Sequence, residues 1–331
     1  MVDFAAVFEA LRKKELGAVI AQLGADSPIL RETNSTRYAE WFSGCGMSLL
    51  QIVSYLESEH SQTLLKLGAE LDLHSACALG ELDRIREILT ADPDALEHQI
   101  DTYFPMQFAL SNVDSLRLLL ELGDNANRPL QKLAWFSWED PAAEQGLSDW
   151  RPMHMVALSR RGRIQLELAQ ILKDNGAHLD AAALPFGDTP LHIAAIYNQT
   201  KLIQWLIKNG VDVDVPSSRT EKNAATTELF NDEPFKLFDS FEGTSLMCAA
   251  AEGQKDAVEA LLKCGANARA KDATDLTPLH FAAGALWQEN TEIVKFLLDH
   301  DADPQAQDRE GRTPRDLALV RGYEQTAQML A

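Results

Sequence analysis

The chain lacks most of the short patterns that mark catalytic and metal-binding proteins. It has four cysteines among 331 residues, and none of them forms a Cys-x-x-Cys pair or a finger-like Cys/His spacing. HExxH, GxSxG, Walker-type GxxxxGKS/T and EF-hand patterns are also absent from the sequence. We therefore expect a protein without enzyme activity, bound metal or cofactor. An enzyme with an unrecognised site is kept as an alternative.

Basic residues are scarce relative to acidic ones. Thirty lysines and arginines stand against fifty aspartates and glutamates, which gives a formal charge of −20 at pH 7. Such a charge repels nucleic-acid phosphates and anionic membrane surfaces, so we expect neither as a partner. Residues 51–150 carry −12 of this charge. A basic protein partner is one explanation of this acidity, and plain solubility is the other.

Long apolar runs are missing as well. No stretch approaches 18 consecutive apolar residues, and charged residues interrupt the first 23 positions. This pattern predicts neither a membrane span nor a secretion signal. With four scattered cysteines read as reduced thiols, we expect a cytoplasmic protein that acts as a monomer.

What the chain does have is an internal repeat. Each copy begins with a short run of similar sequence and continues into apolar residues at i, i+3 and i+4. It ends at a Gly- or Asp-rich segment that terminates a helix, as expected for two short helices and a turn. The clearest copies are GDTPLHIAA at 187–195, GTSLMCAA at 243–250, LTPLHFAA at 276–283 and GRTPRDLA at 311–318. The apolar runs after the first three copies contain Ile203/Leu206/Ile207, Val258/Leu261/Leu262 and Val294/Leu297/Leu298.

This pattern resembles the ankyrin repeat, whose TPLHxA signature recurs about every 33 residues. Weaker copies lie around Trp150, Phe104, Leu73 and Gly46. The resemblance implies an all-α fold, an ankyrin-repeat solenoid of stacked helix pairs with hairpin fingers. We count about nine pairs, two or three of them irregular, because neighbouring pairs must share one elongated core.

We expect residues 1–331 to form a single solenoid, in which repeats and insertions follow one another along the chain. We expect an N-terminal capping helix pair and an irregular loop at 1–45, divergent repeats at 46–127, and an aromatic insertion at 128–149. Repeats at 150–214, a second insertion at 215–242, and regular repeats with a C-terminal cap at 243–331 follow.

Two residue types in the signature have structural explanations. Thr189, Thr277 and Thr313 precede a proline, and a hydroxyl at that position caps free N–H groups of the first helix. His154, His192 and His280 occupy the histidine position, where a ring nitrogen bonds neighbouring backbone, so we do not read them as metal ligands. Asp301, Asp303, Asp308 and Glu310 lack calcium-ligand spacing and are read as a solvated acidic finger.

The repeat is interrupted by insertions. Intervals between successive signature positions are 23, 33, 47, 38, 55, 33 and 36 residues, for Gln51, His74, Gln107, His154, His192, Met247, His280 and Asp316. In the ankyrin family the lengthened segment is a hairpin finger that, with the first helices, lines the concave partner-binding face. A third insertion, at 27–45, precedes the Gly46 copy.

The insertions are rich in aromatic residues. Eight of the chain's 24 aromatics lie in the two long insertions or directly after the first one, although loops normally exclude large apolar side chains. We predict that these eight anchor a protein partner. They are Trp135, Phe136, Trp138, Trp150, Phe230, Phe235, Phe238 and Phe241. The alternative is that they fold back onto the solenoid as small satellite cores.

The sequence thus favours a non-catalytic protein-protein interaction module that binds a folded partner through its concave face and aromatic insertions. A second hypothesis is an acidic inhibitor or immunity-type protein that masks a basic enzyme, toxin or transcription factor. Association driven by charge weakens as salt rises, whereas aromatic anchoring does not.

Overall fold

The helices of this protein are short and follow one another in pairs. We analysed a computed structural model that describes residues 3–13, 15–25, 27–33, 47–56, 59–100, 103–130, 150–159, 164–183, 187–217, 243–285 and 288–331. Within these ranges the regular secondary structure is helical, and β-pairing is confined to isolated bridges. The predicted all-α class is confirmed.

Two compact units make up the chain. Unit 1 contains Met1–Pro152 and Gln170–Ala177, and unit 2 contains Met153–Ala169 and His178–Ala331. The organisation of the chain as one continuous solenoid stays a prediction.

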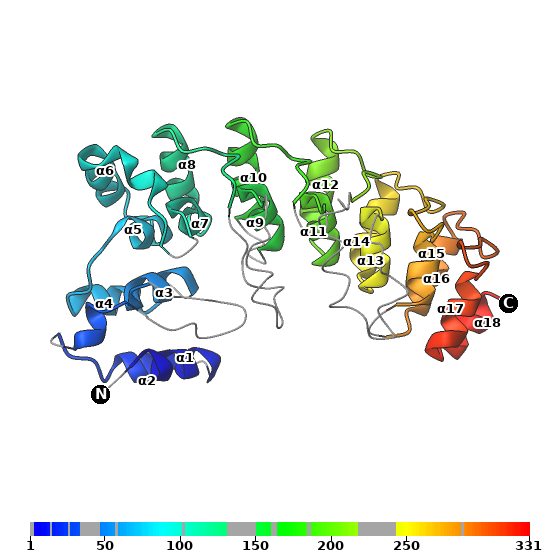
Figure 1. Ribbon diagram of the computed structural model, residues 1–331, viewed down its shortest axis with the longest axis horizontal. Helices are drawn as coiled ribbons and strands as arrows, with labels where there is room; N and C mark the ends of the chain where they lie inside the picture. Colours follow the sequence, from blue (N-terminus) through cyan, green and yellow to red (C-terminus); the bar gives the residue numbers. More distant parts are fainter. Residues whose placement is uncertain are drawn as a thin grey trace. The chain divides into compact units, whose positions relative to one another are not determined.

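In unit 1, the helices before α9 are α1 (Phe4–Lys13), α2 (Leu16–Ile20), α3 (Leu49–Leu56), α4 (Ser61–Lys66), α5 (Leu73–Leu79), α6 (Leu82–Ala91), α7 (Pro105–Ala109) and α8 (Val113–Glu121). Two 3-10 turns, η1 (Pro28–Leu30) and η2 (Pro93–Glu97), lie between them. Helix α3 packs on α5, and α5 packs on α7 (Figure 1). The first helix of each of these pairs therefore contacts the first helix of the next.

The helices from α11 onward belong to unit 2, and the division between the units falls within α10. The helices that follow α8 in the chain are α9 (Pro152–Leu158), α10 (Gln165–Asp174), α11 (Pro190–Ile196), α12 (Thr200–Lys208), α13 (Ser245–Ala251), α14 (Lys255–Lys263), α15 (Pro278–Ala283), α16 (Thr291–Leu298), α17 (Pro314–Arg321) and α18 (Glu324–Met329). First helices α11, α13, α15 and α17 stack in chain order, and α12, α14, α16 and α18 form a second row (Figure 1).

Both rows of helices bury apolar side chains. The first helices bury small residues, such as Ala249, Ala250 and Ala282, which are 0% exposed and let adjacent backbones approach. The second helices bury the predicted stripe, including Leu206 and Leu261 at 0% exposure. Within unit 2, each of these rows therefore buries apolar residues between successive helix pairs.

Most second helices end in a residue with left-handed backbone. Gly210 and Gly265 have φ values of +94° and +92° and follow the C-cap residues of α12 and α14. Asp301, three residues after the end of α16, stands at the same position of its repeat, with φ at +65°. Glycine adopts this conformation without the steric cost that a Cβ atom brings. The predicted stop signals are therefore the turns that direct the chain into each finger.

Candidate partner-binding site

The second insertion begins and ends at one closed base. Pro216 and Thr244 form an antiparallel bridge, and the Ser217 N–H donates to the Gly243 carbonyl oxygen at 3.0 Å. The Ser217 hydroxyl reaches the same oxygen at 3.2 Å. His192 Nε2 adds a third contact to it, at 3.1 Å, from helix α11. Ser217 and Gly243, the residues on either side of 218–242, are therefore held against each other.

The other two insertions start from bases of the same kind. Leu130 and Trp150 form an antiparallel bridge in which the Leu130 N–H donates to the Trp150 carbonyl oxygen at 2.6 Å. Thr33 and Ser48 bridge the ends of the N-terminal insertion. Ordinary fingers close the same way, as at Ala183 and Asp188. Each of the three insertions is thus flanked by bridged residues, between a second helix or turn and the following first helix.

Of the eight predicted anchors, the structure describes one. Trp150 is half-buried at the base of the first insertion. Trp135, Phe136, Trp138, Phe230, Phe235, Phe238 and Phe241 lie outside the described residues. Their role as partner anchors stays a prediction.

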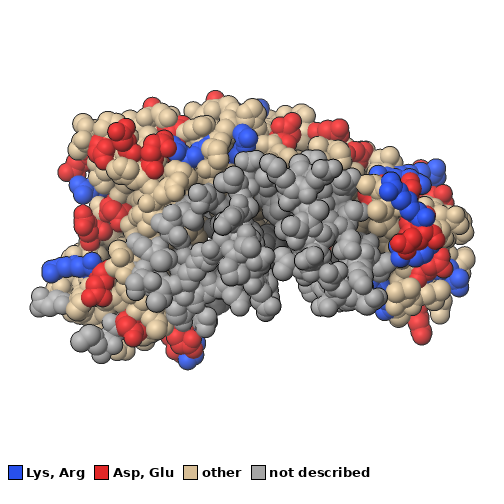
Figure 2. Space-filling model, in the orientation of Figure 1, with Lys and Arg blue, Asp and Glu red and all other residues tan. Residues whose placement is uncertain are grey.

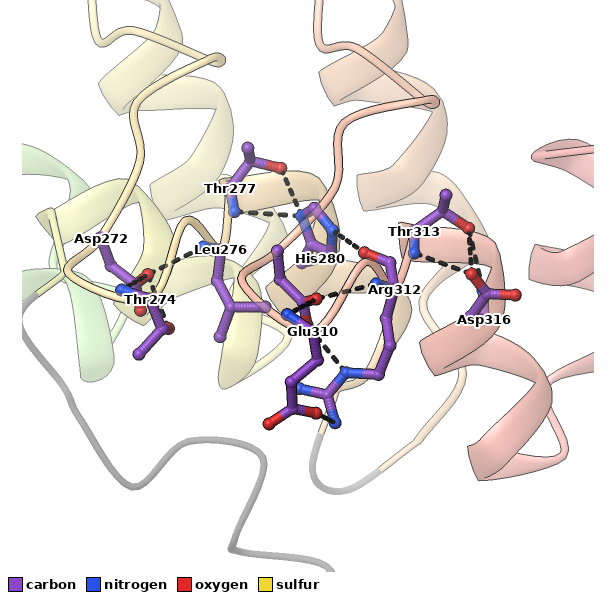
Figure 3. Close-up of polar contacts among 10 residues, drawn as sticks. Asp272, Thr274, Leu276, Thr277, His280, Glu310, Arg312, Thr313 and Asp316 are labelled. Carbon is purple, nitrogen blue, oxygen red and sulfur yellow. Dashed lines mark hydrogen bonds and ion pairs between the residues drawn. The ribbon is translucent and has the colours of Figure 1, made fainter.

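The signature histidines connect one repeat to the next (Figure 3). The Thr277 N–H donates to His280 Nδ1 at 3.1 Å, so Nε2 carries the ring proton and donates to the Arg312 carbonyl oxygen at 3.1 Å. His192 is held the same way, with Thr189 and Gly243 as partners. His74 and His154 also place Nε2 against backbone carbonyls, of Tyr103 and Ala181 respectively. The predicted backbone-bonding role of the histidines is confirmed.

His74, His192 and His280 are neutral in the folded protein at neutral pH. Burial lowers the pKa of His74 and of His192 to about 4, because desolvation disfavours the charged ring. The pKa of His280 is lowered for the same reason. A neutral ring supplies one donor and one acceptor, which is what the two hydrogen bonds of His192 and His280 require.

The signature threonines act partly through the ring. The hydroxyls of Thr189 and Thr277 lie 2.9 Å from Nδ1 of His192 and His280. At Thr313 the hydroxyl accepts the N–H of Asp316 at 3.3 Å and donates to its carboxylate at 2.7 Å (Figure 3). Direct capping of a backbone N–H by the hydroxyl is confirmed at Thr313.

Buried aspartates hold the regular fingers together. Asp272 Oδ1 accepts the N–H groups of Thr274 and Leu276, each at 2.8 Å (Figure 3). Asp308 Oδ1 accepts the N–H of Arg312 at 2.8 Å, and its Oδ2 pairs with the Arg312 guanidinium at 2.7 Å. Burial favours the neutral form of Asp308, but the bonds from Arg312 outweigh it and lower its pKa. The interpretation of Asp308 as a solvated acid is therefore wrong, since it is 7% exposed.

A polar cluster that sequence reasoning missed lies beside the first insertion. Arg128, 6% exposed, directs two guanidinium nitrogens to Asp124 Oδ1 at 2.8 and 2.7 Å. Two more bonds reach Glu97, at 2.6 and 2.8 Å, and the Arg128 guanidinium carbon lies 4.7 Å from the centre of the Phe104 ring. We call Asp124, Arg128, Glu97 and Phe104 the Arg128 clasp. It stands two residues before Leu130.

The acidic surface of unit 1 is partly neutralised by ion pairs. Arg86 pairs with Asp83 at 3.3 Å, and Arg84 pairs with Glu87 at 2.8 Å. Within the Arg128 clasp, Arg128 pairs with Glu97 at 2.6 Å. Acidic and basic side chains lie interspersed on the described surface in Figure 2. Exposed pairs of this kind lower the local field that a basic partner would meet.

Among the described side chains there is no group of three or more His, Cys, Asp or Glu that could hold a metal ion. Burial raises the pKa of Asp72 and Asp272 and of the thiols of Cys77 and Cys248. Such thiols are poor nucleophiles. Cys77, Cys248 and Cys264 are free.

Within the ranges described above, no helix is long and apolar enough to cross a membrane.

Stacked helix pairs linked by fingers define a helical repeat protein, and sequence comparison identifies which kind. A sequence model described as ankyrin repeats, three copies, matches residues 130–217 and 222–331. These residues are more than half of the chain. The chain belongs to the ankyrin repeat family, whose members generally serve as protein-protein interaction modules.

Individual relatives agree with this assignment. The putative ankyrin repeat protein YahD of Escherichia coli (strain K12) is 31% identical over 161 residues, which are 44% of this chain and 79% of that protein. Human ankyrin repeat and SOCS box protein 16 is 27% identical over 217 residues, 64% of this chain but 38% of that protein. Mouse Rabankyrin-5 is 28% identical over 143 residues, 43% of this chain and 11% of that protein. This chain therefore spans well under half of the latter two.

A solved structure shows the same fold. The crystal structure of the human ASB11 ankyrin repeat domain aligns with a TM-score of 0.57 at 22% sequence identity. The alignment covers 79% of this chain and 98% of that domain. The likeness therefore includes most of the stack.

Proposed function

We propose that this chain is a non-catalytic binding module that holds a folded protein partner through its fingers and the concave face that first helices and fingers line in this family. The eight aromatic residues predicted as anchors contact the partner. The observation that carries this proposal is the closed base of each long insertion, at Leu130–Trp150 and at Pro216–Thr244. A loop fixed at its ends loses less entropy on binding than a loop without such a base.

The rigid stack below the fingers supports the same role. His192 ties α11 to the base of the second insertion through Gly243, and its pKa of about 4 keeps this donor neutral at physiological pH. Binding residues carried on such a scaffold are positioned before the partner arrives. We further propose a monomer that acts in the cytoplasm, as the free thiols Cys77, Cys248 and Cys264 favour.

The test compares three variants in partner capture. The first replaces Trp135, Phe136 and Trp138 with alanine, and the second replaces Phe230, Phe235, Phe238 and Phe241. The matched control replaces three exposed apolar residues outside the fingers, Leu319, Val320 and Met329, which are 51%, 71% and 40% exposed. We expect the first two variants to lose the partner, each aromatic anchor contributing about 2 kcal/mol or more, and the control to retain it. Retention by both finger variants would contradict the proposal.

The acidic-inhibitor function is the second candidate. It requires that capture be lost at high salt in the wild-type protein, because charge attraction between exposed groups is screened over about 8 Å at physiological ionic strength. The ion pairs of Asp83, Glu87 and Glu97 with arginines weigh against it. Capture that survives high salt and depends on the finger aromatics excludes this candidate.

A further inference from the structure

Two polar residues of unit 1 occupy positions that are apolar in other repeats. Asp124 follows the left-handed Gly123, and its side chain is fully buried. The residues at the same position in other repeats include Ala69, Val211, Ala266 and Ala302, which are buried, and Ala177, which is half-buried. Arg128 stands four residues later, where three other repeats have Val215, Ala270 and Ala306. The Arg128 clasp is therefore a local departure from the repeat.

The same region lacks a contact that other repeats make. His74, His192 and His280 each donate to a backbone carbonyl at the start of the next repeat. That carbonyl belongs to the residue just before the N-cap of the repeat's first helix, which is Tyr103, Gly243 and Arg312 respectively. At the first insertion the signature residue is Gln107, and the equivalent carbonyl is that of Trp150. Gln107 Oε1 accepts the Phe104 N–H at 2.8 Å, but its buried Nε2 has no hydrogen-bond partner.

A second repeat without this donor also uses a buried aspartate. Met247 occupies the signature position of α13, and its sulfur can accept the Thr244 N–H but has no proton to donate. The finger that follows is closed by Asp272, which accepts the N–H of Leu276 at 2.8 Å. Asp308 accepts the Arg312 N–H in the same way in the finger after His280, so an aspartate at this position closes a finger with or without a ring proton from the preceding helix.

We propose that Arg128 is a positioning residue for the base of the first insertion. The Arg128 clasp holds Leu130 against Trp150 and so replaces the hydrogen bond to the Trp150 carbonyl that Gln107 does not donate. Arg128 binds Asp124, four residues earlier in the chain, and Glu97 at the end of η2. Its guanidinium group also lies over the ring of Phe104, the N-cap residue of α7. These contacts fix the chain immediately before Leu130. The role of the base in partner binding rests on the proposed function.

The clasp is better suited to positioning than to stability. Asp124 Oδ2 is buried without a partner, and burial raises the pKa of Asp124 against the opposing effect of Arg128. Replacing a buried ion pair with apolar residues is often neutral or stabilising, whereas removing one partner leaves a buried charge. The double variant Asp124→Ala/Arg128→Ala restores the residues that two other repeats carry, and it is expected to fold.

Hydrogen exchange of the Leu130 amide, followed by NMR, reports directly on the bond to Trp150. In the double variant we expect this amide to exchange about tenfold faster than in the wild type, while the Ala76 and Ile85 amides of α5 and α6 are unchanged. The control is Asp83→Ala/Arg86→Ala, which removes an exposed ion pair of the same unit. It should leave the Leu130 amide as it is.

A third variant tests whether the clasp replaces the missing donor. Gln107→His in the double-variant background places a ring nitrogen where His192 and His280 carry theirs, and it should restore slow exchange at Leu130. Unchanged exchange at Leu130 in the double variant, or equal acceleration at Ala76 and Ile85, would overturn the positioning role. Failure of Gln107→His to restore protection would overturn the replacement of the donor. These results do not depend on partner capture, so the proposed function can fail separately.

Discussion

His192 and Gly243 are 51 residues apart in the chain, and Nε2 of His192 donates to the Gly243 carbonyl oxygen at 3.1 Å. His280 makes the equivalent bond to Arg312 across 32 residues. The length of the finger between two repeats therefore does not alter how the repeats join. A longer insertion is accommodated at this point at little cost, because each doubling of loop length adds only about 0.6 kcal/mol to the free energy of loop closure.

The neutral histidines make stability depend on pH. Unfolded histidine takes up a proton near pH 6.5, whereas His74 and His192 do so near pH 4 in the folded state. Between these values the unfolded chain binds more protons, so the free energy of unfolding falls as pH is lowered from 6.5 to 4. We expect a loss of up to about 3 kcal/mol for each histidine, measured by denaturant unfolding at several pH values.

The matched control for this pH dependence exists within the chain. Glutamine occupies the signature position at Gln51 and Gln107, where its oxygen accepts the N–H of the residue three positions earlier. His74→Gln/His192→Gln should flatten the stability profile between pH 4 and 6.5. An unaltered slope in this variant would show that other groups cause the acid sensitivity.

We expect the protein to be more stable with glycine than with the natural aspartate at position 301. Its φ of +65° is a left-handed conformation that Gly210 and Gly265 adopt at the same point of other repeats. Asp301→Gly should raise the free energy of unfolding by about 1 kcal/mol, since the Cβ penalty disappears. Thermal unfolding of this variant beside Asp303→Gly, a finger residue without positive φ, measures the effect. A lower midpoint for Asp301→Gly would show that its side chain matters more than its backbone.

Asp316 should stabilise the first turn of α17. Its carboxylate accepts the Thr313 N–H at 2.8 Å and the Thr313 hydroxyl at 2.7 Å. The Thr313 hydrogen bonds lower the pKa of Asp316, so this contribution is present above the unfolded pKa of about 4 and is lost as pH falls through the folded value. Asp316→Ala should cost about 1 kcal/mol at neutral pH, judged by thermal unfolding. Gln328→Ala, an exposed change on α18, should have no comparable effect.

The repeat signature was sufficient to predict the helix pairs and the role of the histidines. TPLH encodes a cap, a proline at the first helical position and a buried donor, and these local features determine the start of α11 and α15. The apolar stripe of the second helices is equally local, which is why Leu206 and Leu261 are buried as the spacing indicates.

The Arg128 clasp escaped prediction because its partners come from separate elements. Glu97 ends η2 and Phe104 caps α7, and no spacing rule links either of them to Arg128. One signal was present in the sequence. Asp124 stands directly after Gly123, in a position that holds Ala266 and Ala302 in later repeats, and a carboxylate in a buried apolar position requires a partner.

The central claim is that a protein partner contacts the two long insertions. The most direct measurement is hydrogen exchange of the free chain and of its isolated complex with a captured partner, read for peptides across the whole sequence. We predict that peptides from 131–149 and 218–242 exchange more slowly in the complex, whereas peptides from α14 and α16 exchange as in the free chain. Protection confined to other segments, with both insertions exchanging as in the free chain, would contradict the claim.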